Sequence, residues 1–219
     1  MDSEFFSQIL DNIEETILIY DDKENLVYKN HDVLDNQEII KRKNINIMGK
    51  NYIMISLGKT EKDELTGVLT KGAFYSRVNY LEDINSCVMV FCDIDNLKYY
   101  NERYGHIETD KIIKGVADII TTNVRSTDIV ARFGGDEFVI LLRGTNVSKS
   151  YDRIESIRKL ICSTAYDLKK VDGTKERVYT SMTFGISSVT KDVLDSMISA
   201  DNMLVDGKKN EKNKVYVKK

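Results

Sequence analysis

The sequence predicts an α/β protein with an antiparallel-containing β-sheet and helices packed on it. Two observations support this prediction. Short apolar runs rich in β-forming residues, such as 86–92 and 138–142, alternate with longer segments of helical spacing. The first run ends abruptly in carboxylates, and a glycine pair just before the second marks a hairpin. Such an order is typical of a sheet covered by helices.

The elements of the larger part follow from the spacing of apolar residues. Residues 71–84 have helical spacing at Phe74, Val78 and Leu81, and residues 106–124 carry one apolar stripe of an amphipathic helix. The other expected elements are strands at 87–93, 127–133, 138–142, 177–189 and 214–217 and helices at 98–104, 149–168 and 191–207.

The first sixty residues predict a smaller module. A short helix is expected at 3–12, strands at 15–21 and 25–30, and a hairpin over 45–56. The connection over 58–62 is short, so two domains are expected, 1–60 and 61–219, with limited movement between them.

Length and composition fit one α/β core with a small extra module. The chain has 219 residues, 42% of them hydrophobic, and a net charge of −3, which gives no general reason to expect nucleic-acid binding. Cys87, Cys92 and Cys162 lack the spacing of metal ligands, so no zinc site is expected. No apolar run approaches a membrane span and the N-terminus lacks a basic export region, which predicts a cytoplasmic protein.

The run Arg132-Phe-Gly-Gly-Asp-Glu-Phe138 brings two glycines and two carboxylates between two strands. Gly134 and Gly135 mark the reversal of a hairpin, because glycine allows a positive φ and a close approach to the backbone. At the tip of a turn, this suits a bound phosphate or sugar. A plain hairpin with Asp136 and Glu137 in solvent is the alternative.

A second group of carboxylates, Asp93-Ile-Asp-Asn96, ends the expected strand at 87–93. Ligands bind at this edge of α/β sheets. We expect Asp93 and Asp136, from neighbouring strands, to converge on one hard cation, since Mg²⁺ prefers carboxylate oxygens, waters and substrate phosphates. For Asp95, a simple role as the cap of the helix that starts near Leu97 is the alternative.

These runs resemble the GGDEF domain family of diguanylate cyclases, over roughly residues 61–219. Several separated motifs in the right order are more specific than one. The other matching stretches are Asp63-Glu-Leu-Thr-Gly67, Asp93-Ile-Asp-Asn-Leu-Lys98, Asn101 through Gly105-His106 to Asp110, Thr180-Ser-Met-Thr-Phe-Gly-Ile186, and Ala200-Asp201 with Lys208, Lys212 and Asn213. The resemblance implies a palm-like central β-sheet of the nucleotidyl cyclase type, flanked by helices.

The resemblance also implies an activity, the condensation of two GTP molecules into cyclic di-GMP and two pyrophosphates. Each 3′-hydroxyl would attack the α-phosphate of the other nucleotide across a homodimer. Mg²⁺ or Mn²⁺ would be the cofactor, with Asp93, Asp136 and the Ile94 carbonyl as ligands. Glu137 would hold a second metal or lie near the attacking hydroxyl, so Asp136 and Glu137 are the expected catalytic residues.

Contacts to the phosphates are implied in the same way. The amides of Asn96, Leu97 and Lys98, at a helix start, suit a phosphate group. Gly134 and Gly135 belong to the same substrate site. Lys208 and Lys212 are expected to meet the triphosphate, and the alternative for them is a solvated lysine cluster.

Base choice follows from the hydrogen-bonding edge of guanine. Guanine presents N1–H and N2–H₂ donors that a carboxylate accepts and adenine lacks. Asp110 stands where the family keeps its guanine-binding aspartate, and Asn101 would complete the contact, so the resemblance implies GTP rather than ATP as the substrate. The alternative is that both are ordinary surface helix residues.

Arg125-Ser-Thr-Asp128 fits the Arg-x-x-Asp inhibitory motif of the family, which implies feedback binding of cyclic di-GMP, although such patterns also arise by chance. The family carries an additional arginine on the following helix. In this chain Ser156 stands at that position, with Arg153 and Arg158 nearby. Leu97 and Thr109 depart from the usual phenylalanine and glycine, which could lower activity without abolishing it.

An active cyclase is thus the leading prediction. The alternatives are a catalytically silent module that senses GTP or cyclic di-GMP, and a purely structural dimerisation protein. Residues 1–60 resemble the start of a PAS sensory domain without most of its cavity helices. We expect a shortened PAS-like α+β module that dimerises rather than binds a cofactor, and a plain extension of the sheet domain is the alternative.

Overall fold

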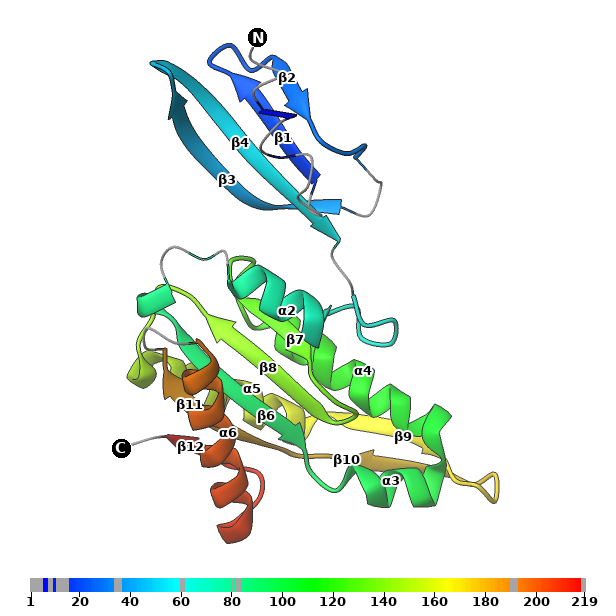
Figure 1. Cartoon of the computed structure of the whole chain (residues 1–219). Coiled ribbons are helices and arrows are strands. Elements are labelled where there is room, and N and C mark those ends of the chain that lie inside the picture. Colours follow the sequence, from blue (N-terminus) through cyan, green and yellow to red (C-terminus); the bar gives the residue numbers. More distant parts are fainter. Residues whose placement is uncertain are drawn as a thin grey trace. The chain divides into compact units, whose positions relative to one another are not determined.

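The computed structural model describes residues 6–7, 10, 16–33, 37–59, 62–79, 81, 84–189 and 193–217. The chain divides into two compact units, Met1–Glu61 and Lys62–Lys219 (Figure 1). None of the helices in these described ranges is long and apolar enough to cross a bilayer.

The first unit contains a four-stranded antiparallel sheet in the order β2-β1-β4-β3. Its strands are β1 Thr16–Asp21, β2 Leu26–Lys29, β3 Gln37–Ile47 and β4 Lys50–Lys59. The expected strands are confirmed, and the expected hairpin is longer than predicted. Met48 and Gly49 form its turn, both with positive φ. Phe6 packs with Ile17, Ile19, Tyr28 and Tyr52 in a small core.

The expected helix at 3–12 lies largely outside the described residues, of which Phe6, Ser7 and Leu10 are helical. The PAS-like character of this unit stays a prediction.

The second unit is built on a six-stranded sheet in the order β12-β11-β6-β8-β7-β5 (Figure 1). Its strands are β5 Leu69–Thr70, β6 Val88–Ile94, β7 Ile129–Arg132, β8 Glu137–Leu142, β11 Met182–Ser188 and β12 Val215–Val217. The inner strand β6 pairs antiparallel with both β8 and β11, while β5 with β7 and β11 with β12 pair in parallel. The predicted mixed sheet is confirmed.

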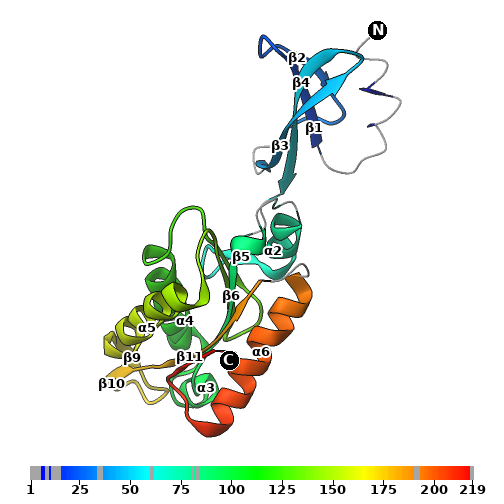
Figure 2. The same cartoon turned by 90° about the vertical axis from the view of Figure 1, so that its left-hand side faces the viewer.

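Helices cover both faces of this sheet (Figure 2). Along β6, Val88, Val90 and Cys92 pack with helices α4 His106–Thr122 and α5 Val147–Ser163. The alternate residues Met89 and Phe91 pack with helices α2 Lys71–Val78 and α6 Val193–Asn210. This period of two explains why β6 is an unbroken apolar run, since both of its faces are buried.

Some element boundaries differ from the prediction. The expected helix 71–84 ends at Val78, and a short 3₁₀ turn, η1 Ile84–Ser86, precedes β6. The expected helix 149–168 ends at Ser163, and strand β9 Ala165–Lys169 follows. Tyr166 and Leu168 alternate with exposed neighbours and enter the core, a strand period that overrides helical continuation.

The expected strand 177–189 is two strands, β10 Lys175–Tyr179 and β11. β10 leaves the main sheet to pair antiparallel with β9. Helix α3 Leu97–Tyr104 lies between β6 and α4 and is confirmed to within one residue.

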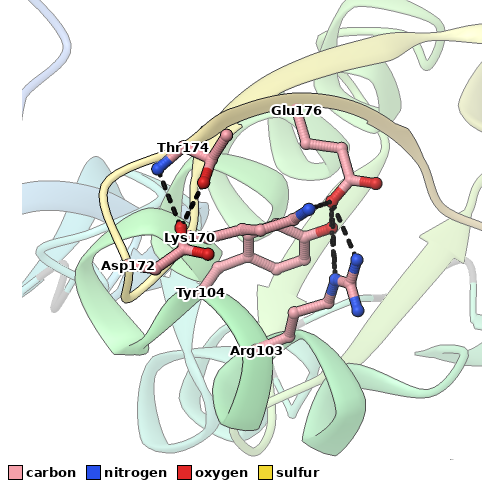
Figure 3. A network of polar contacts seen from close by, with 6 residues as sticks. All are labelled: Arg103, Tyr104, Lys170, Asp172, Thr174 and Glu176. Atoms are coloured by element: carbon pink, nitrogen blue, oxygen red, sulfur yellow. Dashed lines mark hydrogen bonds and ion pairs between the residues drawn. The ribbon is translucent and has the colours of Figure 1, made fainter.

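The hairpin of β9 and β10 is tied to the end of α3 by one carboxylate oxygen (Figure 3). Glu176 Oε2 accepts hydrogen bonds from Tyr104 Oη at 2.8 Å and from Arg103 Nη2 at 3.2 Å, and it pairs with Lys170 Nζ at 3.1 Å. The hydrogen bonds from Tyr104 and Lys170, then that from Arg103, lower the pKa of Glu176 to about 2. The hairpin of β9 and β10 thus stabilises the C-terminal end of α3.

Helix α6 lies directly on β11 at Gly185. A Cβ atom there would lie 2.1 Å from the Ala200 carbonyl oxygen and 2.6 Å from the Leu204 nitrogen, both backbone atoms of α6. No side chain fits in this contact, so the glycine sets the distance between helix and sheet.

We expect Gly185→Ala to lower the free energy of unfolding by about 1–3 kcal/mol, because the helix backbone must move away from the sheet. Urea denaturation measures this change. Gly72→Ala on α2 is the matched control, since its Cβ would meet no atom within 4 Å. Equal stability of the two variants would contradict the close packing of α6.

Replacing Glu176 by Gln should remove a pH-dependent part of the stability. Ionised Glu176 stabilises the fold fully above its unfolded pKa of 4.5, and this contribution is lost as the pH falls toward the folded value of about 2. The difference in Tm between wild type and Glu176→Gln should therefore shrink as thermal unfolding is repeated from about pH 6 to about pH 3.

Tyr104→Phe keeps the ring and removes one donor, so it should show part of the same pH dependence. A Tm difference that stays constant with pH would count against this role of Glu176.

Candidate active site

Three carboxylates meet at the end of β6 and at the hairpin of β7 and β8. Asp93 is paired with Glu137 across the two strands, and the Ile94 N–H donates to the Asp136 carbonyl at 3.0 Å. The structure therefore brings Asp93, Asp136 and Glu137 to one edge of the sheet. Because both strands are buried up to this point, the polar residues lie where the core ends.

Arg132 binds the backbone of the hairpin turn. Its Nε donates to the Gly134 carbonyl at 3.1 Å, and its Nη2 donates to the Gly135 carbonyl at 2.8 Å. Its Nη1 lies 3.1 Å and 3.2 Å from the two carboxylate oxygens of Asp63. One guanidinium thus joins the turn to a motif 69 residues earlier in the chain.

Asp63 is itself well fixed. Its Oδ1 accepts hydrogen bonds from the Thr66 N–H at 2.9 Å and from the Thr66 hydroxyl at 2.6 Å. Burial opposes ionisation of Asp63, but the hydrogen bonds from Thr66 and Arg132 outweigh it and lower its pKa. The ion pair is therefore present at neutral pH.

The glycine pair works differently from the prediction, since neither Gly134 nor Gly135 has a positive φ. A Cβ at Gly134 would lie 2.7 Å from Glu137 Oε2, so this glycine makes room for a carboxylate of the hairpin itself. At Gly135, a Cβ would meet no atom within 4 Å. The second glycine faces open space, where a ligand can approach the backbone.

Asp93 is the most strongly perturbed carboxylate of the site. Burial raises its pKa to about 6, the ion pair with the Lys208 ammonium opposes the rise, and the charges of Asp136 and Asp95 add to it. The side chains of Asp93 and Lys208 are only 18% and 23% exposed. Concentrated negative charge at this edge thus attracts a cation.

Asp95 is buried and does not cap α3, so the alternative of a simple helix cap is wrong. Its carboxylate accepts hydrogen bonds from Ser181 Oγ at 2.6 Å, Thr183 Oγ1 at 2.7 Å and the Asn213 N–H at 3.0 Å. The capping position belongs to Asn96, whose φ is 59° and whose side chain caps no amide. The three donors hold Asp95 more firmly than the first turn of a helix would.

The end of α6 and the segment that follows it lie against the strand end that carries these carboxylates. Lys208 pairs with Asp93, Lys212 Nζ donates to Asn96 Oδ1 at 2.7 Å, and the Asn213 N–H reaches Asp95. Both predicted phosphate-binding lysines are therefore at the site. Lys98 extends into solvent, in a loose pair with Glu102 at 3.9 Å.

A cavity of about 470 Å³ adjoins the carboxylates. Five predicted site residues line it, namely Leu97, Lys98, Asn101, Gly135 and Asp136. Glu102 and His106 line it too; His106 was named only within the matching stretch 101–110, and Glu102 was given no role. The spacing of four residues from Lys98 to Glu102 on α3 was the available signal for Glu102.

Asp110 does not line this cavity. It lies on α4, one helical turn after His106 and on the same face, and it is partly buried. The predicted base-reading pair of Asn101 and Asp110 therefore comes from two consecutive helices.

Arg125 and Asp128 line a separate cavity of about 230 Å³. The side chain of Asp128 is fully buried. It accepts hydrogen bonds from the N–H groups of Arg125 and Arg143 and pairs with Arg153 at 3.2 Å. Arg153, which lies one helical turn before Ser156, is therefore in contact with the Arg125–Asp128 motif.

The donor set fits a hard divalent cation. The described residues contain no group of three or more His, Cys, Asp or Glu side chains arranged to hold a metal. Asp93 and Asp136 offer carboxylate oxygens, and Ile94 offers its carbonyl. The Lys208 ammonium that pairs with Asp93 shows that this position favours positive charge. Two carboxylates completed by waters and phosphates are typical of Mg²⁺.

Residues 60–214 match the family model described as "Diguanylate cyclase, GGDEF domain". Diguanylate cyclase A of Treponema denticola is 32% identical over 173 residues, which are 74% of this chain and 46% of that protein. The probable diguanylate cyclase DgcT of Escherichia coli is 26% identical over 196 residues, or 83% of this chain and 42% of that protein. The chain spans less than half the length of these two relatives.

Solved structures show the same likeness. The GGDEF domain of DgcB from Caulobacter crescentus, in complex with c-di-GMP, superposes with a TM-score of 0.65 at 25% identity, covering 71% of this chain and 92% of that one. The GGDEF domain of TpbB from Pseudomonas aeruginosa gives a TM-score of 0.61 at 25% identity and covers 69% and 97% of the two chains. With its palm-like sheet, its hairpin of two carboxylates and a family match that spans most of its length, the chain belongs to the GGDEF diguanylate cyclase family.

Proposed function

We propose that the chain is an active diguanylate cyclase that joins two GTP molecules into cyclic di-GMP and releases two pyrophosphates. The observation that supports this most is the meeting of Asp93, Asp136 and Glu137 beside a cavity that Gly135 leaves open. Asp136 lines this cavity of about 470 Å³, and Asp93 and Glu137 lie beside it on paired strands.

Asp93, Asp136 and the Ile94 carbonyl would hold Mg²⁺ or Mn²⁺. When bound, the metal neutralises phosphate charge and makes the attacking 3′-hydroxyl more acidic. Glu137 lies at the start of β8, opposite Asp93, with its carboxylate over Gly134. We assign it to a second metal or to the attacking hydroxyl.

The phosphates would bind at the start of α3. The first amides of this helix, from Asn96 to Lys98, are not capped by the Asn96 side chain, so their N–H groups can meet an anion. Lys208 and Lys212 reach the same place from the end of α6. A bound triphosphate would draw both lysines from their present partners.

Guanine would lie between α3 and α4. Asn101 lines the cavity, and Asp110 follows His106 on the neighbouring helix. The carboxylate of Asp110 would accept from the N1–H and N2–H₂ groups of guanine. Adenine offers neither donor, so GTP is the expected substrate.

Catalysis would require a homodimer, because one unit provides one GTP site and the ring needs two nucleotides. We propose that residues 1–60 help to form this dimer and that the reaction takes place in the cytoplasm, where GTP is available. Arg125 and Asp128 are the proposed product-binding site. Arg153 already neutralises Asp128, and among the described residues the Arg125 guanidinium has no ion-pair partner, which leaves it available for a phosphate.

A silent GTP or cyclic di-GMP sensor is the alternative, favoured by departures from the family pattern. Two of these departures are accommodated without strain. Leu97 is buried in the main core, and the Thr109 hydroxyl donates to the Gly105 carbonyl at 2.9 Å within α4. They leave the carboxylates in place, so we prefer the enzyme.

Purified protein incubated with GTP and Mg²⁺ should form cyclic di-GMP, measured by chromatography and mass. Asp136→Ala should lower the rate by more than about 100-fold, beyond the loss typical of residues that merely support a metal ligand. Asp152→Ala, at an exposed position of α5, is the control. If wild type dimerises and binds GTP but forms no product, the silent sensor replaces the enzyme.

Asp110→Ala should weaken the binding of a non-hydrolysable GTP analogue by roughly 10-fold or more, the effect of one lost hydrogen bond to a charged group. Binding of the matching ATP analogue should not change. Calorimetry gives both affinities, with Asp118→Ala, exposed on the same helix, as control. An equal loss for both nucleotides would show that Asp110 does not read the base.

A further inference from the structure

We propose that Lys208 is a resident counter-ion of Asp93 that competes with the metal and so couples metal binding to nucleotide binding. This inference rests on the proposed function, because it concerns the same site. It assigns to Lys208 a second task besides contact with the triphosphate.

The position of Lys208 is built into the fold. Its neighbour Gly207 is buried, and a Cβ there would lie 2.1 Å from Cδ2 of the Tyr216 ring. Leu204 is buried, and the Ala200 backbone lies on Gly185. The last turns of α6 therefore pack against both β11 and β12, and the Lys208 side chain starts from a fixed backbone.

The next residue shows what an ordinary lysine does here. Lys209 Nζ pairs with Asp206 at 2.8 Å within its own helix, and both side chains are at least 65% exposed. Such a pair contributes little. Lys208 instead crosses to another element and contacts Asp93, and both partners are mostly buried.

The site needs a positive charge even without a metal. Asp136 and Asp95 both add negative charge near Asp93, and burial makes that charge costly. The Lys208 ammonium pairs with Oδ1 of Asp93 and compensates this negative charge. Removing one partner of a mostly buried ion pair leaves the other uncompensated, so the empty site depends on this lysine.

A divalent cation and an ammonium cannot share this oxygen without strong repulsion. In this proposal, metal binding to the free protein therefore includes the loss of the Lys208 contact with Asp93. A triphosphate changes the balance, because it offers the ammonium a new anionic partner. Nucleotide binding would then raise metal affinity, and by linkage the metal would raise nucleotide affinity by the same factor.

Lys208→Met keeps the length of the side chain and removes its charge. We expect this variant to bind Mn²⁺ alone about tenfold more tightly than wild type, the order expected for one charge-assisted contact. The further gain in Mn²⁺ affinity caused by a saturating non-hydrolysable GTP analogue should be smaller than in wild type. Titration of Mn²⁺ followed by electron paramagnetic resonance measures both quantities without any turnover.

Two matched variants complete the test. Lys209→Met should behave as wild type, and Lys208→Arg, which keeps the charge, should keep weak binding of Mn²⁺ alone. Thermal unfolding verifies that each variant is folded. Lys208→Arg also keeps the proposal testable if Lys208→Met does not fold, because an arginine variant that binds Mn²⁺ alone more tightly than wild type would overturn it.

The outcomes separate this inference from the function on which it rests. Binding of Mn²⁺ alone by Lys208→Met that is equal to or weaker than that of wild type would overturn the competition while leaving the cyclase intact. If wild type binds no Mn²⁺ even with the nucleotide, the metal site itself fails, and both proposals fall with it.

Discussion

The candidate site depends on one buried carboxylate that takes no part in the proposed chemistry. Asp95 is 1% exposed and accepts hydrogen bonds from Ser181, Thr183 and the Asn213 amide. These donors belong to the start of β11 and to the turn before β12. Leaving a buried charged acceptor short of a donor costs roughly 1–3 kcal/mol or more, so the three segments are held together. Asp93, the start of α3 and the segment that carries Lys208 and Lys212 all adjoin this anchor.

A second constraint acts on the hairpin from the other side. Arg132 binds the carbonyls of Gly134 and Gly135 and pairs with Asp63, so the turn is held by its backbone while its side chains stay available. A fixed turn lets Asp136 line the cavity with little loss of conformational freedom on binding. Because Asp95 holds one wall of the site and Arg132 the other, substrate contacts come from segments that are far apart in sequence.

Local chemistry made several parts of this arrangement predictable. The apolar run of β6 followed by Asp93, and the glycine pair before β8, predicted a strand end and a hairpin that the structure contains. The structure also brings Asp93, Asp136 and Glu137 together. Of the two reasons given for the glycines, the positive φ was wrong, whereas the open space at Gly135 agrees with the expected close approach to the backbone. Glu102 and His106 were missed, since a cavity wall formed by consecutive helices leaves only a weak trace in sequence.

By itself, the sequence determined where β6 ends, where the chain reverses before β8 and which residue types stand there, because apolar period and glycine act over a few residues. Only the tertiary structure decided the partners of the carboxylates. Asp95 finds its donors 86 to 118 residues away, Lys208 crosses from α6 to Asp93, and Arg153 pairs with Asp128. The same holds for β9, which continues a helical pattern in sequence but becomes a strand once β10 pairs with it. The reason is that burial, which decides these contacts, exists only after distant segments have packed.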